Sequence, residues 1–526
     1  MDMSLQKRSD PRPLAALVGL VLGCCLLASL VFADVSSANV PESGLNCVEA
    51  SGKISGRGST YQNNLQEELA KGYANDFCGT TGVETAEDKV GGKERGEAGG
   101  TMIAYNTPEA EKNSVTGSGA GLKAASCRTD AFAGTDLPYS LKQLEELDEK
   151  PGTLLETEDK GTGKPTCTET IAGKYKPPFQ PNVPEVWPDT EAGKEDTTAN
   201  VMSFPIGGSS VALPVHLTPE NCGNEVKNVP TSLEFTAKEV SRIFGGDAAN
   251  WDDAELVKNN AALANCTAPI VRIVREDNSG TTSIFKNYLI RAESTGVEQA
   301  GVRTTFATCQ PTKAWSAPEF TESPNTKWPG KPTVEGTCSK IESATGSGGP
   351  ALITKLKETS GGIGYADLSN ATGVEGEGLV LPTVKNQLGS AAKAPSASKG
   401  ANCTYSVVSL PGTTAEEAVG LNPKDNWANN NNTNAGAPEN HFNTTDLGSL
   451  YPICGLTFDL VYTGLSNTKG GNNPISRLSA NQRRTLYSYM TYILSSTAQD
   501  KLTTFDYAPL PTAWLPTLRK GFQKEF

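Results

Sequence analysis

Histidine is the rarest residue of this 526-residue chain, which has only His216 and His441. None of its 12 cysteines are spaced as C-x-x-C. A structural zinc site needs closely spaced Cys and His ligands, and a Ser/His/Asp triad needs a histidine in a suitable motif. His216 lies in a short apolar stretch, where a histidine is usually satisfied within a core or at a strand edge. The sequence therefore predicts no metal site, no cofactor and no catalytic site.

Three motifs of nucleotide-binding proteins and hydrolases also fail here. Glu158 stands where a P-loop around Gly163-Lys164 needs glycine. Tyr61 replaces the third glycine of a dinucleotide-binding fingerprint, and Thr116 replaces the first glycine of G-x-S-x-G around Ser118. We therefore expect a protein that binds its ligand without covalent chemistry, and not an enzyme.

Positive charge is also scarce, with 46 Lys and Arg against 59 Asp and Glu, for a net charge of −13. A chain this acidic repels nucleic acid and anionic membrane surfaces, so nucleic acid is not an expected partner. The chain has 53 glycines and 33 prolines, and 20% of its residues are charged, which is typical of a loop-rich globular protein. Its length predicts two or more lobes.

The N-terminus has the three parts of a secretory signal. Lys7, Arg8 and Arg12 precede an apolar run over 14–32, which ends at the small residue Ala33. We predict a signal peptide over residues 1–33 and an exported protein that is periplasmic, on the cell surface or secreted. The alternatives are an uncleaved membrane anchor and, less well supported, a lipid anchor at Cys24.

Ten cysteines remain after residue 33, singly along the chain, and an even number in an exported protein predicts disulfides. Neighbours in sequence are the expected neighbours in space in a sequentially wound fold. The predicted pairs are Cys47–Cys78, Cys127–Cys167, Cys222–Cys266, Cys309–Cys338 and Cys403–Cys454.

A short Gly/Ser/Thr loop precedes a helical pattern at three places, residues 56–61, 116–121 and 275–282. The first turn of a helix has N–H groups without helical acceptors, and glycine lets an anion approach them closely. Each loop alone could simply supply an N-cap. Three such loops, one of them starting at Arg275, favour a convergent oxyanion pocket.

The order of the motifs resembles that of the phosphate-binding proteins of phosphate-specific ABC importers, a branch of the type II periplasmic-binding-protein fold. The motifs that carry the resemblance are Gly58-Ser59-Thr60-Tyr61, the glycine loop 117–123, Phe132–Pro138, Arg275–Thr282, Gly361–Tyr365 and Asp506–Pro511. The resemblance covers the chain from about residue 50 to its C-terminus. The large insertions and the number of cysteines depart from the family's pattern.

The resemblance implies roles for individual residues. Thr60, Tyr61 (through its backbone N–H) and Ser118 would donate to phosphate from the first two loops. Arg275 would be the charged contact, and Asp277 would orient it. Residues Ser279, Gly280 and Thr281 would form the third cradle.

Asp136 matches the family's acceptor for the proton of the ligand. From the sequence alone, another interpretation is equally good: a turn or N-cap residue ahead of a helix with a capping box at Ser140 and Gln143.

We predict a two-lobed α/β protein with an interlobe cleft and large loop insertions. Lobe 1 is expected over 34–206 and 456–526, and lobe 2 over 207–455. The composition of residues 82–100, 145–203 and 310–350 indicates insertions. The resemblance implies that the chain captures inorganic phosphate for an ABC permease at the membrane, as a monomer. The alternatives are a binder of another tetrahedral oxyanion such as sulfate, a secreted phosphoesterase, and a surface protein whose insertions bind a macromolecule.

Overall fold

The protein is described by a computed structural model. The described residues are 52–78, 103–106, 116–127, 130–137, 201–294, 309, 315, 326–329, 338–373, 378–386, 391–396, 410–421, 427, 450–462, 478 and 480–526. The predicted signal peptide and the insertion 82–100 lie outside them, as does all but the end of the insertion 145–203. Among these residues, no helix is long and apolar enough to cross a membrane.

A six-stranded sheet, the first sheet, has the order β10-β4-β13-β3-β1-β2. The bounds of its strands are β1 Ile54–Gly58, β2 Ile103–Tyr105, β3 Phe132–Thr135, β4 Val201–Ala212, β10 Ala366–Asp367 and β13 Cys454–Tyr462. β1 is parallel to β2 and β3, whereas β13 is antiparallel to both β3 and β4. Every residue of β1, β4 and β13 is buried, which is expected of strands covered on both faces.

A five-stranded sheet, the second sheet, has the order β11-β5-β9-β7-β8. Its strands are β5 Val215–His216, β7 Val271–Arg275, β8 Lys340–Ala344, β9 Gly362–Ile363 and β11 Leu379–Val380. β7 is parallel to β8 and β9, and β5 is antiparallel to β9. Two further short strands, β6 Glu234–Phe235 and β12 Thr383–Val384, pair with each other.

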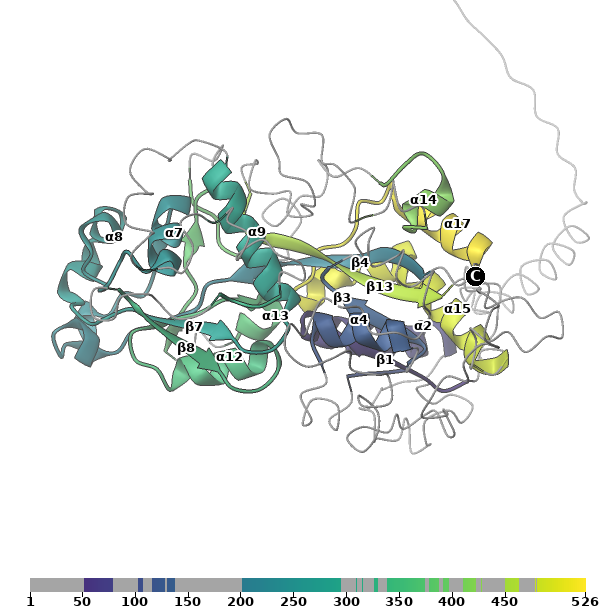
Figure 1. Ribbon diagram of the computed structural model, residues 1–526, viewed down its shortest axis with the longest axis horizontal. Coiled ribbons are helices and arrows are strands. Elements are labelled where there is room, and N and C mark those ends of the chain that lie inside the picture. The colour runs from purple at the N-terminus through teal and green to yellow at the C-terminus, as the bar shows by residue number, and fades with distance from the viewer. Residues whose placement is uncertain are drawn as a thin grey trace, which may run out of the picture. The chain divides into compact units, whose positions relative to one another are not determined.

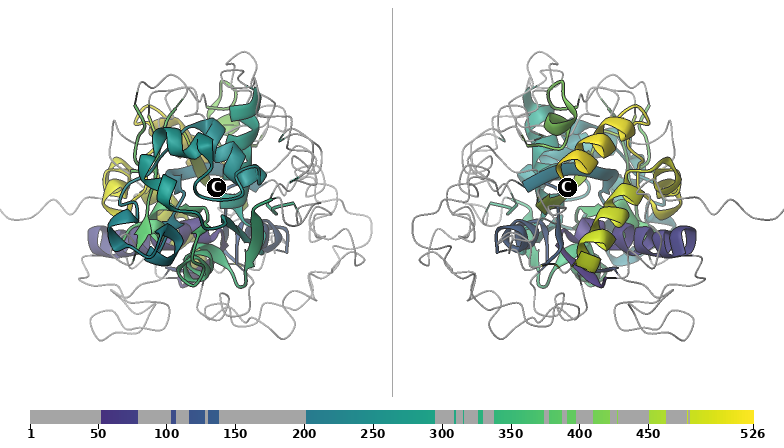
Figure 2. Two further views of the ribbon diagram at one scale, coloured as in Figure 1. Left: turned by 90° about the vertical axis from the view of Figure 1, so that its left-hand side faces the viewer. Right: turned by 90° about the vertical axis from the view of Figure 1, so that its right-hand side faces the viewer.

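Helices lie against both sheets, as the alternating strand and helix patterns predict (Figure 1). The longer helices are α2 Asn63–Cys78, α4 Ser118–Cys127, α7 Ala237–Gly245, α9 Gly280–Ser294, α12 Gly348–Lys357, α15 Ala480–Ile493 and α17 Leu515–Glu525. The shorter ones are α8 Ala254–Asn259, α13 Leu368–Ala371, α14 Ala415–Ala418 and α16 Ser496–Gln499. α4 contacts β1 and β3, and α12 contacts β7. The C-terminal helix α17, yellow in Figure 2, packs against α14 and α15.

The chain passes between the two sheets through short segments that lie side by side. Residues 213–214 join β4 to β5, and residues 364–365 join β9 to β10. Gly364 N donates to Pro214 O at 3.1 Å, and Val211 N donates to Ile453 O, just before β13, at 2.8 Å. The predicted lobe boundaries fall within β4 and β13, and the division into lobes at these residues remains a prediction.

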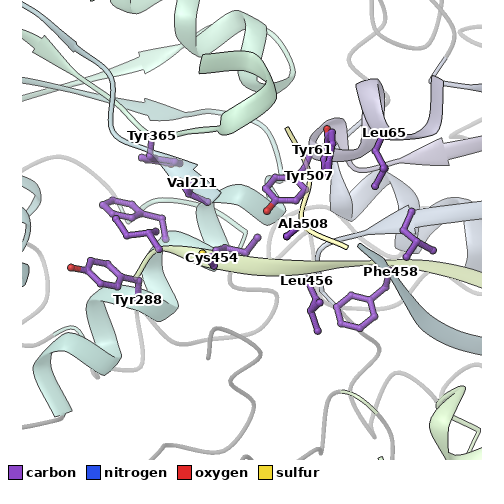
Figure 3. Packing of buried hydrophobic residues seen from close by; sticks show 14 of the residues in the cluster. Tyr61, Leu65, Val211, Tyr288, Tyr365, Cys454, Leu456, Phe458, Tyr507 and Ala508 are labelled. Atoms are coloured by element: carbon purple, nitrogen blue, oxygen red, sulfur yellow. The ribbon is translucent and has the colours of Figure 1, made fainter. Parts of the chain in front are cut away.

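Aromatic side chains fill the core where β4 and β13 meet the first helix start. Tyr61 and Tyr507 are in edge-to-face contact, with ring centroids 6.2 Å apart (Figure 3). Tyr365 stacks on Phe285 of α9, with centroids 5.0 Å apart. Such pairs are worth about 0.5–1.5 kcal/mol beyond the area they bury.

Two of the predicted disulfides are present, Cys222–Cys266 and Cys309–Cys338. Cys454 is also disulfide-bonded. The other three predicted pairs each include a side chain outside the described residues: Cys47, Cys78, Cys127, Cys167 and Cys403.

The interpretation of residues 310–350 as an insertion is wrong at its C-terminal end. Residues 340–344 form β8 and residues 348–350 start α12, so both belong to the second sheet and its helix layer. Pro350 lies within the first helical turn, where the missing N–H of proline costs nothing. At residues 346–350, the Gly/Ser/Pro composition therefore marks a helix start rather than a long loop.

Candidate functional site

The three glycine loops predicted from the sequence each begin a helix. Ser59 caps the 3-10 helix η1 (Thr60–Gln62), with its Oγ accepting from Tyr61 N at 3.1 Å. Ser118 is the first residue of α4. Ser279 Oγ accepts from Thr282 N at 3.1 Å and so caps α9. The first and third loops follow β1 and β7, at strand ends where α/β proteins commonly bind ligands.

These loops meet although they are far apart in sequence. Arg275 Nη2 donates to Thr60 Oγ1 at 3.2 Å, across 215 residues of chain. Gly117 N donates to Gly58 O at 2.8 Å, and Gly119 N donates to Asn278 O at 3.4 Å. The structure therefore brings the residues predicted for all three loops into one place.

The guanidinium of Arg275 binds a carboxylate on one edge, and its Nη1 has no acceptor among the described residues. Asp277 accepts from Nε at 2.5 Å and also from Nη2. Burial alone would lower the pKa of Arg275, but Asp277 more than offsets this, so the pKa lies above its usual value and the guanidinium is charged. Nη1 is buried and has no hydrogen-bond partner within the described part of the chain. A buried charged donor without an acceptor costs several kcal/mol in free energy. Proteins tolerate such a donor where a ligand supplies the acceptor, so this one indicates a site that binds an anion.

Asp136 is a buried carboxylate, 5% exposed, that receives three hydroxyl donors. Oδ2 accepts from Ser59 at 2.6 Å and from Ser118 at 3.0 Å, and Oδ1 accepts from Thr457 at 2.6 Å. Burial, and to a smaller extent the charge of Asp367, raise its pKa to about 6, against the three hydrogen bonds that lower it. Asp136 is therefore ionised at neutral pH and protonated in mild acid.

Tyr61 has a different environment from the one the resemblance implies. Its N–H donates to Ser59 Oγ, and its hydroxyl donates to Ser209 O at 2.6 Å in the core. Ser279 and Thr281 are each 1% exposed at the start of α9, where N–H groups have no helical acceptor. The site roles of these residues remain predictions.

Several residues of this site were not predicted from the sequence. Ser59 and Thr457 donate to Asp136, and Asp367, on β10, has a buried Oδ1 without a partner among the described residues. Ser59 lies within a quoted motif and could have been found. Asn106 holds the first loop in register, since its side chain exchanges hydrogen bonds of 2.9 and 2.8 Å with Gly58 N and O.

Gly280 shows how closely the two sheets' loops approach. A Cβ at this position would lie 2.2 Å from both Ser118 Oγ and Asp136 Oδ2. Gly280→Ala must therefore push α9 away from α4, and we expect a loss of about 1–3 kcal/mol in the free energy of unfolding. Urea denaturation measures this, with Ser343→Ala at an exposed position of β8 as the control. An unchanged free energy would mean that the loops lie further apart than the structure has them.

In the described part of the chain, no group of three or more His, Cys, Asp or Glu side chains could hold a metal ion. The chemistry available at the site consists of hydroxyl and N–H donors, one guanidinium and carboxylate acceptors. This set can bind an oxyanion by hydrogen bonds.

Comparison with known proteins gives one domain and several partial relatives. The family model of a PBP superfamily domain matches residues 188–410. The phosphate-binding protein PstS of Xylella fastidiosa is 25% identical over 142 residues, which is 27% of this chain and 30% of that protein. The PstS of Haemophilus influenzae is 36% identical over 72 residues, 14% of this chain and 22% of its own length. The chain thus matches less than a third of each of these two relatives.

Solved structures resemble the chain over most of its length. A phosphate-binding protein from Stenotrophomonas maltophilia has a TM-score of 0.51 and 16% identity, and the alignment covers 89% of this chain and 93% of that one. An ancestral soluble variant of the human phosphate-binding protein has a TM-score of 0.50 at 16% identity, with the same coverage. Likeness at this level establishes the fold, which is the two-lobed periplasmic-binding-protein fold that the sequence predicts.

Proposed function

The chain has the two-lobed periplasmic-binding-protein fold and carries a PBP superfamily domain, and we propose that it captures inorganic phosphate as an extracytoplasmic solute-binding protein of an ABC-type importer. Its partners are then phosphate and a permease at the membrane. The protein acts as a monomer after export, and binding involves no covalent chemistry.

The observation that carries this proposal is the buried Nη1 of Arg275, for which the described residues supply no hydrogen-bond acceptor. It lies in a buried cluster with the starts of η1, α4 and α9, where Asp277 already accepts from the other side of the guanidinium. A tetrahedral oxyanion would supply the acceptor that Nη1 lacks, and the first-turn N–H groups would add neutral donors. Each charge-assisted hydrogen bond of this kind contributes about 1.5–3 kcal/mol.

The acidity of the chain does not oppose anion binding. Exposed carboxylates further away than about 8 Å are screened at physiological salt, whereas the donors of the cleft act at hydrogen-bond distance. Asp136 favours phosphate among the oxyanions, because a carboxylate can accept the proton that phosphate keeps near neutral pH and sulfate lacks. The names of the partial relatives point to the same ligand.

Isothermal titration of the mature protein, residues 34–526, tests the proposal. We expect saturable binding of phosphate with one site per chain, and sulfate binding that is weaker by about 10³-fold or more at pH 7.5. A phosphate monoester should bind weakly, because Ser118, Asp136 and Arg275 are buried and its substituent would have to be buried with them. Tight sulfate binding would favour the other-oxyanion alternative, and turnover of the monoester would favour a phosphoesterase. Binding of none of the three would leave a macromolecular partner as the better hypothesis.

A further inference from the structure

A chain of buried amide and hydroxyl groups runs from the first helix start to Asp136. Gln62 Nε2 donates to Thr457 Oγ1 at 2.7 Å, and Thr457 Oγ1 donates to Asp136 Oδ1 at 2.6 Å. Gln62 and Thr457 are both fully buried. Gln62 belongs to η1, Thr457 to β13, and Asp136 follows β3, so these hydrogen bonds link the first helix start to two strands of the first sheet.

The direction of these hydrogen bonds is fixed by a backbone carbonyl. Gln62 Nε2 also donates to Phe458 O at 2.8 Å, and a carbonyl oxygen can only accept. A flipped amide would place Gln62 Oε1 against that oxygen, so both hydrogens of Nε2 are committed. Thr457 must therefore accept from Gln62, and its single hydrogen is left for Asp136. The other acceptor near this hydroxyl, Thr135 O, is further away at 3.4 Å.

A second buried glutamine, Gln66, donates a hydrogen bond to the side chain of Gln62. Gln66 Nε2 donates to Gln62 Oε1 at 3.1 Å and to the two carboxylate oxygens of Asp459 at 2.9 and 3.0 Å. Gln66 Oε1 accepts from Tyr489 OH at 2.8 Å. Gln62 Oε1 can only accept, because Phe458 O fixes the position of Gln62 Nε2, so Gln66 must present its Nε2 to it and its amide orientation is determined as well. The whole chain therefore has one polarity.

This polarity decides what Asp136 can offer to a ligand. A carboxylate has about four acceptor positions, and the hydroxyls of Ser59, Ser118 and Thr457 occupy three of them. Oδ1 has one donor and therefore one position left. Because Thr457 arrives as a donor, it favours the ionised carboxylate, in which that position accepts a proton from the ligand.

We propose that Thr457 and Gln62 are positioning residues that keep Asp136 a hydrogen-bond acceptor and thereby set the selectivity of the cleft for a protonated oxyanion. This rests on the proposed function. Without the hydroxyl of Thr457, the ionised carboxylate loses one of its three donors, and Asp136 becomes protonated at higher pH. A protonated Asp136 can donate to sulfate, so discrimination against sulfate falls.

Other ionisable groups lie near Asp136, and the effect of their titration on affinity has to be distinguished from that of Asp136 itself. They are Asp367 of β10, Tyr105 of β2 and Tyr507. Two further charged groups act on these neighbours: Asp459 of β13 on Tyr105, and Arg275 on Asp367. Burial raises the pKa of both tyrosines well above its usual value, so they stay neutral in the assay range. Burial also raises the pKa of Asp367, and that of Asp459 to about 8. Asp367→Asn and Asp459→Asn are therefore measured alongside.

Thr457→Val tests the proposal, since it removes the hydroxyl and keeps the shape. Phosphate and sulfate affinities are titrated at half-unit intervals from pH 5 to 8.5. We expect Thr457→Val to reduce the phosphate-to-sulfate ratio at pH 7 by about 10-fold or more, because one charge-assisted hydrogen bond corresponds to about one to two pKa units. The pH at which selectivity is lost moves up by about one unit or more, and Thr457→Ser restores the wild-type profile.

Gln62→Met is the second variant, should Thr457→Val fail to fold. It frees the hydroxyl to turn away from Asp136, so its profile should move in the same direction. Thr504→Val, at an exposed threonine of the C-terminal region, is the matched control and should leave the profile unchanged. Lower melting temperatures in Thr457→Val with unchanged selectivity and pH profile would overturn the proposal. A wild-type protein that binds no phosphate would instead refute the proposed function.

Discussion

Arg275→Ala is expected to weaken phosphate binding by about 10²-fold or more. The substitution removes a buried, charge-assisted donor to the anion, worth about 1.5–3 kcal/mol. It also leaves Asp277, whose side chain is 9% exposed, without the guanidinium that now neutralises it. An unpaired carboxylate would then repel the ligand, so the loss should exceed that of one hydrogen bond. Titration calorimetry with phosphate measures the effect.

Arg275→Lys should recover only part of the affinity. An ammonium group cannot hold both oxygens of Asp277 and present a further fixed donor to the ligand. Arg272→Met is the matched control, because Arg272 is equally buried on the same strand but donates to Phe244 O and Ser339 O. We expect Arg272→Met to lower the melting temperature and to keep the affinity. Phosphate binding by Arg275→Ala at the wild-type level would make the third loop structural and the site assignment wrong.

Asp136→Asn should narrow the difference between phosphate and sulfate, which we expect to be about 10³-fold or more in the wild-type protein. Sulfate offers only lone pairs to the lone pairs of Asp136, and a buried acceptor facing a like charge costs several kcal/mol. The asparagine oxygen can take the place of Oδ2, where Ser59 and Ser118 donate. Its NH₂ then replaces Oδ1, the Thr457 hydroxyl turns its hydrogen towards Thr135 O, and the NH₂ presents a donor that sulfate can use. Calorimetry with both anions measures the ratio of affinities.

The pH dependence provides an independent check on Asp136. Because its pKa is raised to about 6, the wild-type protein at pH 5 carries a neutral, donating Asp136. Its selectivity should therefore fall towards that of Asp136→Asn as the pH drops from 8 to 5, while the variant shows little change. If Asp136 were only a helix cap, the variant would have a lower melting temperature with unaltered selectivity at every pH.

Most of the candidate site could be predicted from the sequence because its donors belong to local motifs. Glycine and serine before an apolar helical pattern indicate a helix start, and Arg275 precedes such a start directly. The order of the motifs supplied the fold. What local patterns do not contain is which atoms of distant loops meet, so the three loops predicted a shared pocket, whereas the hydrogen bond of Arg275 to Thr60 was not predicted.

The residues that were not predicted lie where the alternation of polar and apolar residues gives no information about which side chains are buried. Thr457 lies in β13, a strand that is buried on both faces. Such a strand has no alternation of polar and apolar residues, so its sequence does not show which side chains point towards the site. Gln62 and Gln66 are polar, so the helical pattern predicts that they face solvent. Both are fully buried and donate hydrogen bonds to residues of β13. The start of α12 was mistaken for a loop because its glycines and proline resemble linker composition.

The short crossings between the two sheets restrict how the sheets can move against one another. Backbone hydrogen bonds connect these segments side by side. Gly364 N donates to Pro214 O, which joins segment 364–365 to segment 213–214, and Val211 N donates to Ile453 O just before β13. Adjacent connections of this kind act as a single pivot line. Rotation about that line needs only dihedral changes within a few residues, whereas sliding along it would break both bonds. We therefore expect the relative motion of the two sheets to be an opening and closing about one axis, in which the contact between Arg275, at the end of β7, and Thr60, after β1, breaks or forms as one event.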